Sequence, residues 1–269
     1  IKRWLDRNKH RPWALYVNLQ GTHFPYKLPE HSARPFRPDE PDPATFTYLR
    51  YPKGELEVVK NRYDNALAYV DRQIGRLRNH LKAIGELEDT LWIITSDHGE
   101  MFHEHGLVTH GQTLYDAESR VPIIVYWPKR VKPRDVWYPV SHLDIMPTVT
   151  ELLGLPEHPS YQGRSMLHPP EGTAPAVFMN IQGLRFADGI VCYPWKLVYD
   201  VTGRQAFLFN LEKDPSDETN LMRERPRVAA SLATLMQAQI DAQLGYHEGD
   251  DDERDEYFQP RLGRCPVLD

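Results

Sequence analysis

The chain has 269 residues, of which 41% are hydrophobic and 26% are charged, a composition typical of a soluble globular protein of at most two domains. Its net charge is −6, and much of the acid lies in residues 250–256, which argues against nucleic acid or an anionic membrane as a partner. No apolar run reaches the length of a membrane span. The two cysteines lie far apart in the sequence and do not indicate a disulfide framework.

The beginning of the chain has neither a methionine nor a signal peptide, and residues 1–5 are typical of the end of a helix. We therefore expect the C-terminal part of a longer protein, whose compartment and oligomeric state cannot be predicted from these residues.

Residues 12–19 have the composition and length of a buried strand. The loop that follows carries His23, two residues before Pro25. A polar side chain at the end of a buried strand is where α/β proteins build ligand sites, so His23 is a candidate site residue. The alternative is a loop histidine that caps a turn. Residues 27–53, rich in proline and charge, predict a long loop that either contacts substrate or is a variable surface excursion.

Residues 56–84 predict a long helix, because their apolar side chains recur at steps of three and four, and Gly85 ends it. A strand follows at 90–96. Strand, helix and strand in this order predict a crossover unit of a parallel sheet. This second strand delivers Asp97 and His98 at its carboxyl end, where Gly99 permits the turn that would let both side chains reach one metal ion.

Further motifs follow in order: Glu104-His105-Gly106, His110-Gly111, Leu114-Tyr115-Asp116 and residues 120–125. Together with Asp97-His98-Gly99 they resemble the second half of the sulfatases, a branch of the alkaline-phosphatase superfamily. The resemblance implies an α/β fold, with an alkaline-phosphatase-like mainly parallel sheet flanked by helices, and a small C-terminal antiparallel sheet and helix.

For the site, the resemblance implies that Asp97 and His98 are ligands of one divalent metal ion, with Ca²⁺ favoured over Mn²⁺ or Mg²⁺. It implies that His23 and His110 contact the transferred group as catalytic and substrate-binding residues, and it includes His105 less directly. The alternatives are a helix cap for Asp97, a packed imidazole for His98, a structural hydrogen bond for His110 and a loop-orienting role for His105.

The rest of the chain predicts mostly short elements. We expect strands at 121–127 and 136–140, a helix over 141–153 that Gly154 ends, and a last helix over 226–243. Four short antiparallel strands are expected between 176 and 209, with turns at Asp188-Gly189 and Gly203. The predicted domains are 1–172, the second half of the α/β core, then 173–245, the C-terminal sheet and helix, and 246–269, an acidic disordered tail.

The nucleophile of the family lies in a Cys/Ser-x-Pro-x-Arg motif whose first residue is converted to formylglycine, and we expect it upstream of this chain. Cys192-Tyr193-Pro194 imitates the motif, but Lys196 stands where arginine is expected, so Cys192 is rejected. The resulting prediction is metal-dependent hydrolysis of an anionic small-molecule or carbohydrate sulfate ester, with this chain supplying part of the active site. A phosphoester or phosphonate hydrolase, a phosphoglycerol-type transferase and an inactive anion-binding module remain alternatives.

Overall fold

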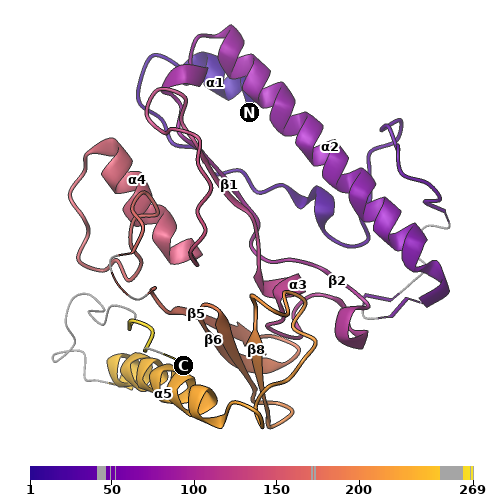
Figure 1. Cartoon of the computed structure of the whole chain (residues 1–269). Helices are drawn as coiled ribbons and strands as arrows, with labels where there is room; N and C mark the ends of the chain where they lie inside the picture. Colours follow the sequence, from indigo (N-terminus) through magenta and orange to yellow (C-terminus); the bar gives the residue numbers. More distant parts are fainter. Residues whose placement is uncertain are drawn as a thin grey trace. The chain divides into compact units, whose positions relative to one another are not determined.

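The computed structural model describes residues 1–40, 47–48, 50–51, 53–170, 172, 174–248, 263–266 and 268 (Figure 1). The chain divides into two compact units, residues 1–110 with 121–132 and residues 111–120 with 133–269. The domain boundaries predicted at 172 and 245 stay predictions. The predicted acidic tail, residues 246–269, lies for the most part outside the described residues.

The first unit is dominated by α2, a helix of 28 residues. The predicted helix is confirmed, and Gly85, with φ +81°, stands directly after its last turn as expected. Leu81 packs with Leu5 and Leu87 in one buried cluster, which ties α2 to the first helix of the chain. The elements of this unit are α1 (Lys2–Asn8), α2 (Leu56–Ala83), β1 (Trp92–Thr95), β2 (Met101–Phe102), β3 (Val108–Thr109) and β4 (Ile123–Tyr126).

The strand predicted at 12–19 is wrong. These residues form no regular element, and Tyr16 is 89% exposed. Apolar composition creates no strand unless a neighbouring strand satisfies its backbone groups, and no strand of the described residues pairs with this segment. The expected crossover unit is therefore not formed. β1 pairs instead with β4 in antiparallel register, and because every strand pair in the described part is antiparallel, the mainly parallel sheet stays a prediction.

Residues 33–40, which belong to the long loop predicted at 27–53, are hydrogen-bonded to α2. Asn65, fully buried on α2, accepts from the Phe36 backbone N–H at 3.0 Å and donates to the Phe36 carbonyl at 2.9 Å. Arg62 donates to the carbonyl of Asp39 at 2.9 Å, and Arg72 donates to that of Ala33 at 3.2 Å. These side chains satisfy part of the loop backbone and anchor residues 33–40 to α2.

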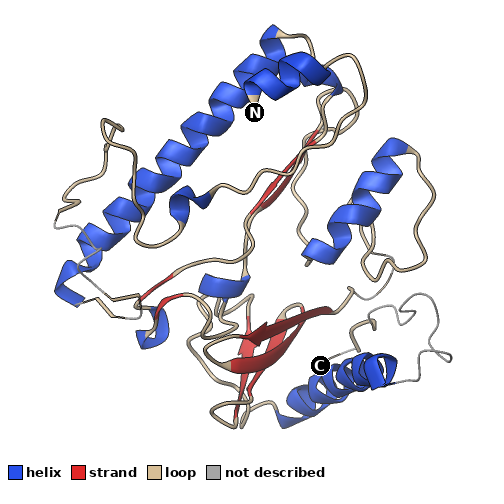
Figure 2. Ribbon diagram, turned by 180° about the vertical axis from the view of Figure 1, so that it is seen from behind, coloured by secondary structure: helices blue, strands red, loops and turns tan. Residues whose placement is uncertain are grey.

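The second unit is built on a four-stranded antiparallel sheet in the order β5-β6-β7-β8, which confirms the predicted C-terminal sheet (Figure 2). Helix α5 packs against it through Val228, Leu232 and Met236. The predicted helices are confirmed as well, and Gly154 ends α4 in the left-handed conformation. The elements are α3 (Asp116–Ser119), α4 (Ile145–Leu153), β5 (Val177–Gln182), β6 (Phe186–Cys192), β7 (Trp195–Asp200), β8 (Gln205–Asn210) and α5 (Pro226–Glu248).

Two smaller predictions in this unit are wrong. Residues 136–140 form no strand, and Trp137 is 79% exposed. Asp188-Gly189 is not a turn but lies inside β6. A Cβ at Gly189 would lie 3.0 Å from Leu114 and 3.1 Å from Met179, so the glycine serves close packing against the sheet, which a local turn signal cannot reveal.

A buried ion cluster joins α3 to the sheet. The Lys196 ammonium, 0% exposed on β7, donates to Asp116 at 2.6 Å and to Asp217 at 2.9 Å. Burial raises the pKa of the Asp217 carboxyl above its usual value, and the charge of Lys196 opposes that shift. Lys196 therefore has a structural role. The lysine that stands in place of arginine after Cys192-Tyr193-Pro194 belongs to this ion cluster.

Cys192 and Cys265 form a disulfide, which corrects the expectation from the sequence. Their Cα atoms lie 5.4 Å apart although 73 residues separate them, and both side chains are buried in the cluster between the sheet and α5. The described terminal segment also bonds to the chain before β5, where Ala176 N–H donates to the Gly263 carbonyl at 3.2 Å. Cys192 is therefore not a free thiol and cannot be a nucleophile in this state. No helix in the described part combines the length and apolar character that a bilayer crossing needs.

We predict that Cys192→Ala, Cys265→Ala and the double variant each lower the free energy of unfolding by about 2–4 kcal/mol, because a cross-link over a long loop restricts the unfolded chain. The three losses should be nearly equal, since each variant removes the same bond. Denaturant unfolding with and without reductant measures them. Two titratable thiols in the denatured, unreduced protein would contradict the assignment.

Candidate active site

Asp97 and His98 lie in the turn that follows β1. The Ser96 hydroxyl donates to the His98 carbonyl at 2.6 Å, and the His98 backbone N–H donates to Asp97 Oδ1 at 3.1 Å. Asp97 caps no helix, because the chain continues from this turn into β2. Its side chain is 85% exposed, so its carboxylate is held in place by the turn and is open to a ligand.

The ring of His98 is oriented by its own backbone. His98 Nδ1 lies 2.8 Å from the Gly99 carbonyl, which can only accept, so Nδ1 carries the hydrogen and Nε2 has the free lone pair. His98 Nε2 lies 3.8 Å from Asp97 Oδ2. Nitrogen and oxygen bonds to a divalent cation add up to about 4.5 Å, so one ion could touch both atoms.

His23 is presented by a 3-10 helix, Gln20–Thr22, that lies close against α2. A Cβ at Gly21 would stand 2.6 Å from Val70 Cγ2. The 3-10 helix can therefore lie this close to α2 because residue 21 has no side chain. His23 Nδ1 lies 2.7 Å from the Phe24 carbonyl and therefore carries the hydrogen, as in His98. The ring is exposed, which leaves its Nε2 accessible.

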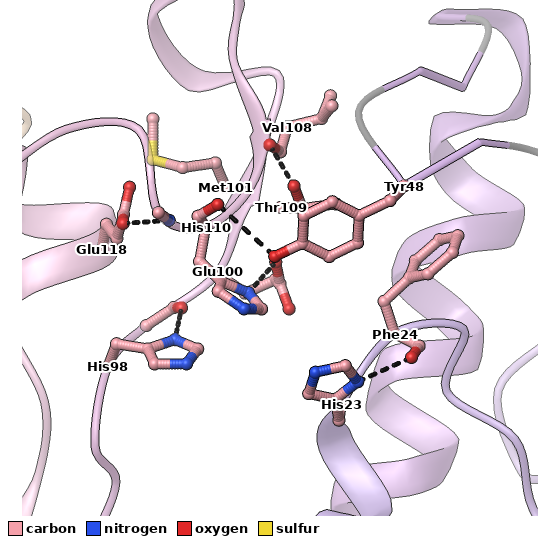
Figure 3. Close-up of polar contacts among 12 residues, drawn as sticks. His23, Phe24, Tyr48, His98, Glu100, Met101, Val108, Thr109, His110 and Glu118 are labelled. Atoms are coloured by element: carbon pink, nitrogen blue, oxygen red, sulfur yellow. Dashed lines mark hydrogen bonds and ion pairs between the residues drawn. The ribbon is translucent and has the colours of Figure 1, made fainter. Parts of the chain in front are cut away.

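The rings of His23, His98 and His110 come together from three separate segments of the first unit (Figure 3). The His98 and His110 rings lie 4.0 Å apart between centroids, and the His23 and His110 rings lie 5.7 Å apart. Sequence reasoning named all three residues, and the structure brings them together. Their individual roles stay predictions.

His110 is held at the end of β3 by an unusual backbone. Thr109 has φ +62° and Gly111 has φ +83°, so a buried β-branched residue occupies the left-handed region. Such a conformation costs on the order of 1–3 kcal/mol and persists only where surrounding contacts enforce it. His110 Nδ1 lies 3.2 Å from Glu100 Oε1, a contact with a carboxylate that is 6% exposed.

Sequence reasoning missed Glu100 and Tyr48. The Tyr48 ring lies 5.4 Å from that of His110 and 5.8 Å from that of Phe24, and its hydroxyl donates to the His110 carbonyl at 3.4 Å. A single tyrosine in a loop carries no periodic signal. Glu100, in contrast, could have been found had a hairpin been predicted between it and His110.

His105 occupies a 3-10 turn between β2 and β3, where it is exposed and has φ 50°. Its neighbour His103, with φ 73°, places its ring 5.1 Å from that of Tyr51. Together with Gly106 at φ +74°, three left-handed residues lie in one short connection, which is consistent with a role for His105 in shaping the hairpin, the alternative to substrate contact.

For a metal ion, the donor chemistry of Asp97 and His98 fits, since an exposed carboxylate and an imidazole with a free Nε2 are both competent ligands. The fit is partial, because no group of three or more metal-ligating side chains lies together within the part of the chain that the structure describes. These two residues could therefore contribute two of the ligands of a complete site.

A family model described as sulfatase matches residues 1–155. The chain belongs to the sulfatase family. The matched stretch contains His23, Asp97, His98, His105 and His110, which are all the predicted site residues of this sulfatase chain.

Relatives agree with this assignment. Over 266 residues the chain is 30% identical to a choline-sulfatase of Rhizobium meliloti (strain 1021). The alignment covers 87% of this chain and 51% of that relative. A solved structure in complex with its substrate D-glucosamine-2-N,6-O-disulfate matches with a TM-score of 0.59 at 24% identity, over 75% of this chain and 44% of the other. A phosphonate monoester hydrolase from Silicibacter pomeroyi matches with a TM-score of 0.57 at 22% identity, over 79% and 46%. These structures share the alkaline-phosphatase-like fold, and this sulfatase chain spans about half the length of such relatives.

We predict that Gly21→Ala displaces the 3-10 helix below His23 and lowers the free energy of unfolding by about 1–3 kcal/mol, because the new methyl group overlaps Val70. Val70→Ala removes the overlapping atoms, so the double variant should recover most of that loss. Denaturant unfolding of the wild type, both single variants and the double variant measures the coupling. Strictly additive effects would contradict the close approach.

Proposed function

We propose that the chain supplies one side of the active site of a metal-dependent sulfatase that hydrolyses sulfate esters. The observation that carries the proposal is the grouping of three imidazole rings, with centroid distances of 4.0 Å and 5.7 Å, beside the exposed carboxylate of Asp97. Nδ1 lies against a backbone carbonyl in the rings of His23 and His98, which leaves their Nε2 for a ligand, and against Glu100 in the ring of His110. Membership of the sulfatase family supplies the sulfate ester as the ligand class.

The chemistry that these residues offer is charge compensation and proton transfer. Cleavage of a sulfate ester builds negative charge on the departing oxygen and on the sulfuryl oxygens. His110, when it also carries a proton on Nε2, would hand that proton to the departing alkoxide. His23, when it also carries a proton on Nε2, would donate to the sulfuryl oxygens, and the ring of Tyr48 would lie beside His110.

Asp97 and His98 would hold the metal ion, through a carboxylate oxygen and through Nε2. We favour Ca²⁺, with Mn²⁺ or Mg²⁺ as alternatives, since a carboxylate suits a hard cation and an imidazole shifts the preference toward a borderline one. Such an ion would supply a positive field for the sulfate oxygens. The remaining ligands of the ion and the formylglycine nucleophile are expected from residues outside this chain. Residues 1–269 alone should therefore not hydrolyse a sulfate ester.

The substrate class we propose is a small-molecule or carbohydrate sulfate ester. The family itself and the choline-sulfatase relative support a sulfate ester, and the solved structure with a glucosamine disulfate suggests a sugar as one carrier. The three imidazoles suit an anion, and nothing about the net charge of −6 favours a nucleic acid.

The test is hydrolysis by the full-length natural protein of choline sulfate, an aryl sulfate, a glucosamine sulfate and a phosphonate monoester, together with its metal content. We predict that Asp97→Ala lowers the bound metal and reduces kcat/KM for the sulfate ester by about 10- to 100-fold or more. Asp89→Ala is the matched control, because Asp89 is also an exposed aspartate and pairs with Lys129 at 2.7 Å.

Unchanged metal content in Asp97→Ala would remove Asp97 from the ligands. Faster turnover of the phosphonate than of every sulfate ester would reassign the substrate class. Metal binding and anion binding without turnover of any ester would favour an inactive binding module.

A further inference from the structure

The β2–β3 hairpin sets Glu100 opposite His110. Its register pairs Met101 with Thr109 and Phe102 with Val108. One step further along the same register Glu100 faces His110, and the structure joins the two at 3.2 Å between Oε1 and Nδ1. Directly opposite residues in an antiparallel pair are close enough for their side chains to interact, and the register brings Glu100 and His110 to the same end of the hairpin.

The contact is shielded from water. The Glu100 side chain is 6% exposed and that of His110 is 16% exposed. Three tyrosines, Tyr26, Tyr51 and Tyr63, surround the carboxylate. Burial raises the pKa of each phenol, and the negative charge of Glu100 raises it further. The phenols therefore stay neutral next to the Glu100 carboxylate.

A carboxylate at Nδ1 decides which nitrogen of His110 carries the hydrogen. An ionised carboxylate only accepts hydrogen bonds, so Nδ1 must donate. A neutral imidazole carries a single N–H, which leaves the lone pair on Nε2. Without an acceptor at Nδ1, the ring could carry its hydrogen on either nitrogen and could turn about its side-chain bonds.

We propose that Glu100 is a positioning residue for His110, whose carboxylate fixes the orientation of the ring and its Nδ1–H tautomer so that Nε2 is the nitrogen presented to the sulfate group. Glu100 itself touches no substrate. The statement that Nε2 faces a sulfate group rests on the proposed function. The tautomer, in contrast, is a property of the protein that can be measured without substrate.

The proposal explains the strained approach to His110. Thr109 at φ +62° turns the chain between the last hairpin pair and His110. The ring nevertheless meets Glu100 on one side and lies 4.0 Å from the ring of His98. A residue that only filled space would not require a buried carboxylate at one nitrogen, since burying such a charge is costly unless it is paired.

The test uses the full-length natural protein with Glu100→Ala and Glu100→Leu, which remove the acceptor, and Glu100→Gln, whose amide oxygen can still accept from Nδ1. Glu151→Gln is the matched control, because Glu151 also pairs with a histidine, contacting His168 Nε2 at 2.6 Å on the surface of the second unit. Nitrogen NMR of imidazole-labelled protein at mildly alkaline pH, where neutral imidazoles predominate, reports the tautomer. The His110 signals are assigned by their loss in His110→Asn.

We expect the wild type and Glu100→Gln to hold His110 mainly as the Nδ1–H tautomer, and Glu100→Ala and Glu100→Leu to show both tautomers. Turnover of a sulfate ester should fall by about 10- to 100-fold in kcat for Ala and Leu, less for Gln, with KM changed little, because orienting partners of functional imidazoles contribute about that much. Glu151→Gln should match the wild type in both measurements.

An unchanged Nδ1–H tautomer in the Ala or Leu variant that still melts at the wild-type temperature would overturn the proposal. So would a loss in Gln equal to that in Ala with the tautomer intact. If the wild type hydrolyses no sulfate ester, the proposed function fails, while the tautomer measurement still decides the role of Glu100.

Discussion

The approach of the His98 and His110 rings to 4.0 Å is the interaction on which the site depends. His98 follows β1 directly, and His110 follows a hairpin that leaves and returns within a few residues. Since the two imidazoles meet only if this hairpin closes, its short register governs where the two rings lie. The left-handed residue Thr109 shows that the chain accepts local strain to make that closure.

The two units achieve rigidity by different means. In the first, side chains of α2 hydrogen-bond to the backbone of residues 33–40 and anchor this irregular segment. In the second, a buried ammonium between two carboxylates and a disulfide join segments distant in sequence.

Sequence periodicity predicted the elements that stabilise themselves locally. The apolar stripe of α2 and the short strands of the C-terminal sheet are read from neighbouring residues, and both are confirmed, although the turn predicted at Asp188-Gly189 is wrong. Residues 12–19 have the apolar composition of a strand but lack a partner among the described residues, and composition says nothing about partners. The Cys192–Cys265 bond and the packing role of Gly189 depend in the same way on segments that only the folded chain brings together.

For the site, motif order named the three histidines, while the orienting contacts of their rings came only from the structure.

The most direct test of the central claim is a crystal structure of the full-length natural protein with Mn²⁺, located by its anomalous scattering, and sulfate. The account predicts the ion within bonding distance of Asp97 and His98 Nε2, with the sulfate against His23 and His110. An ion held elsewhere, or the three imidazoles facing separate surfaces, would contradict it.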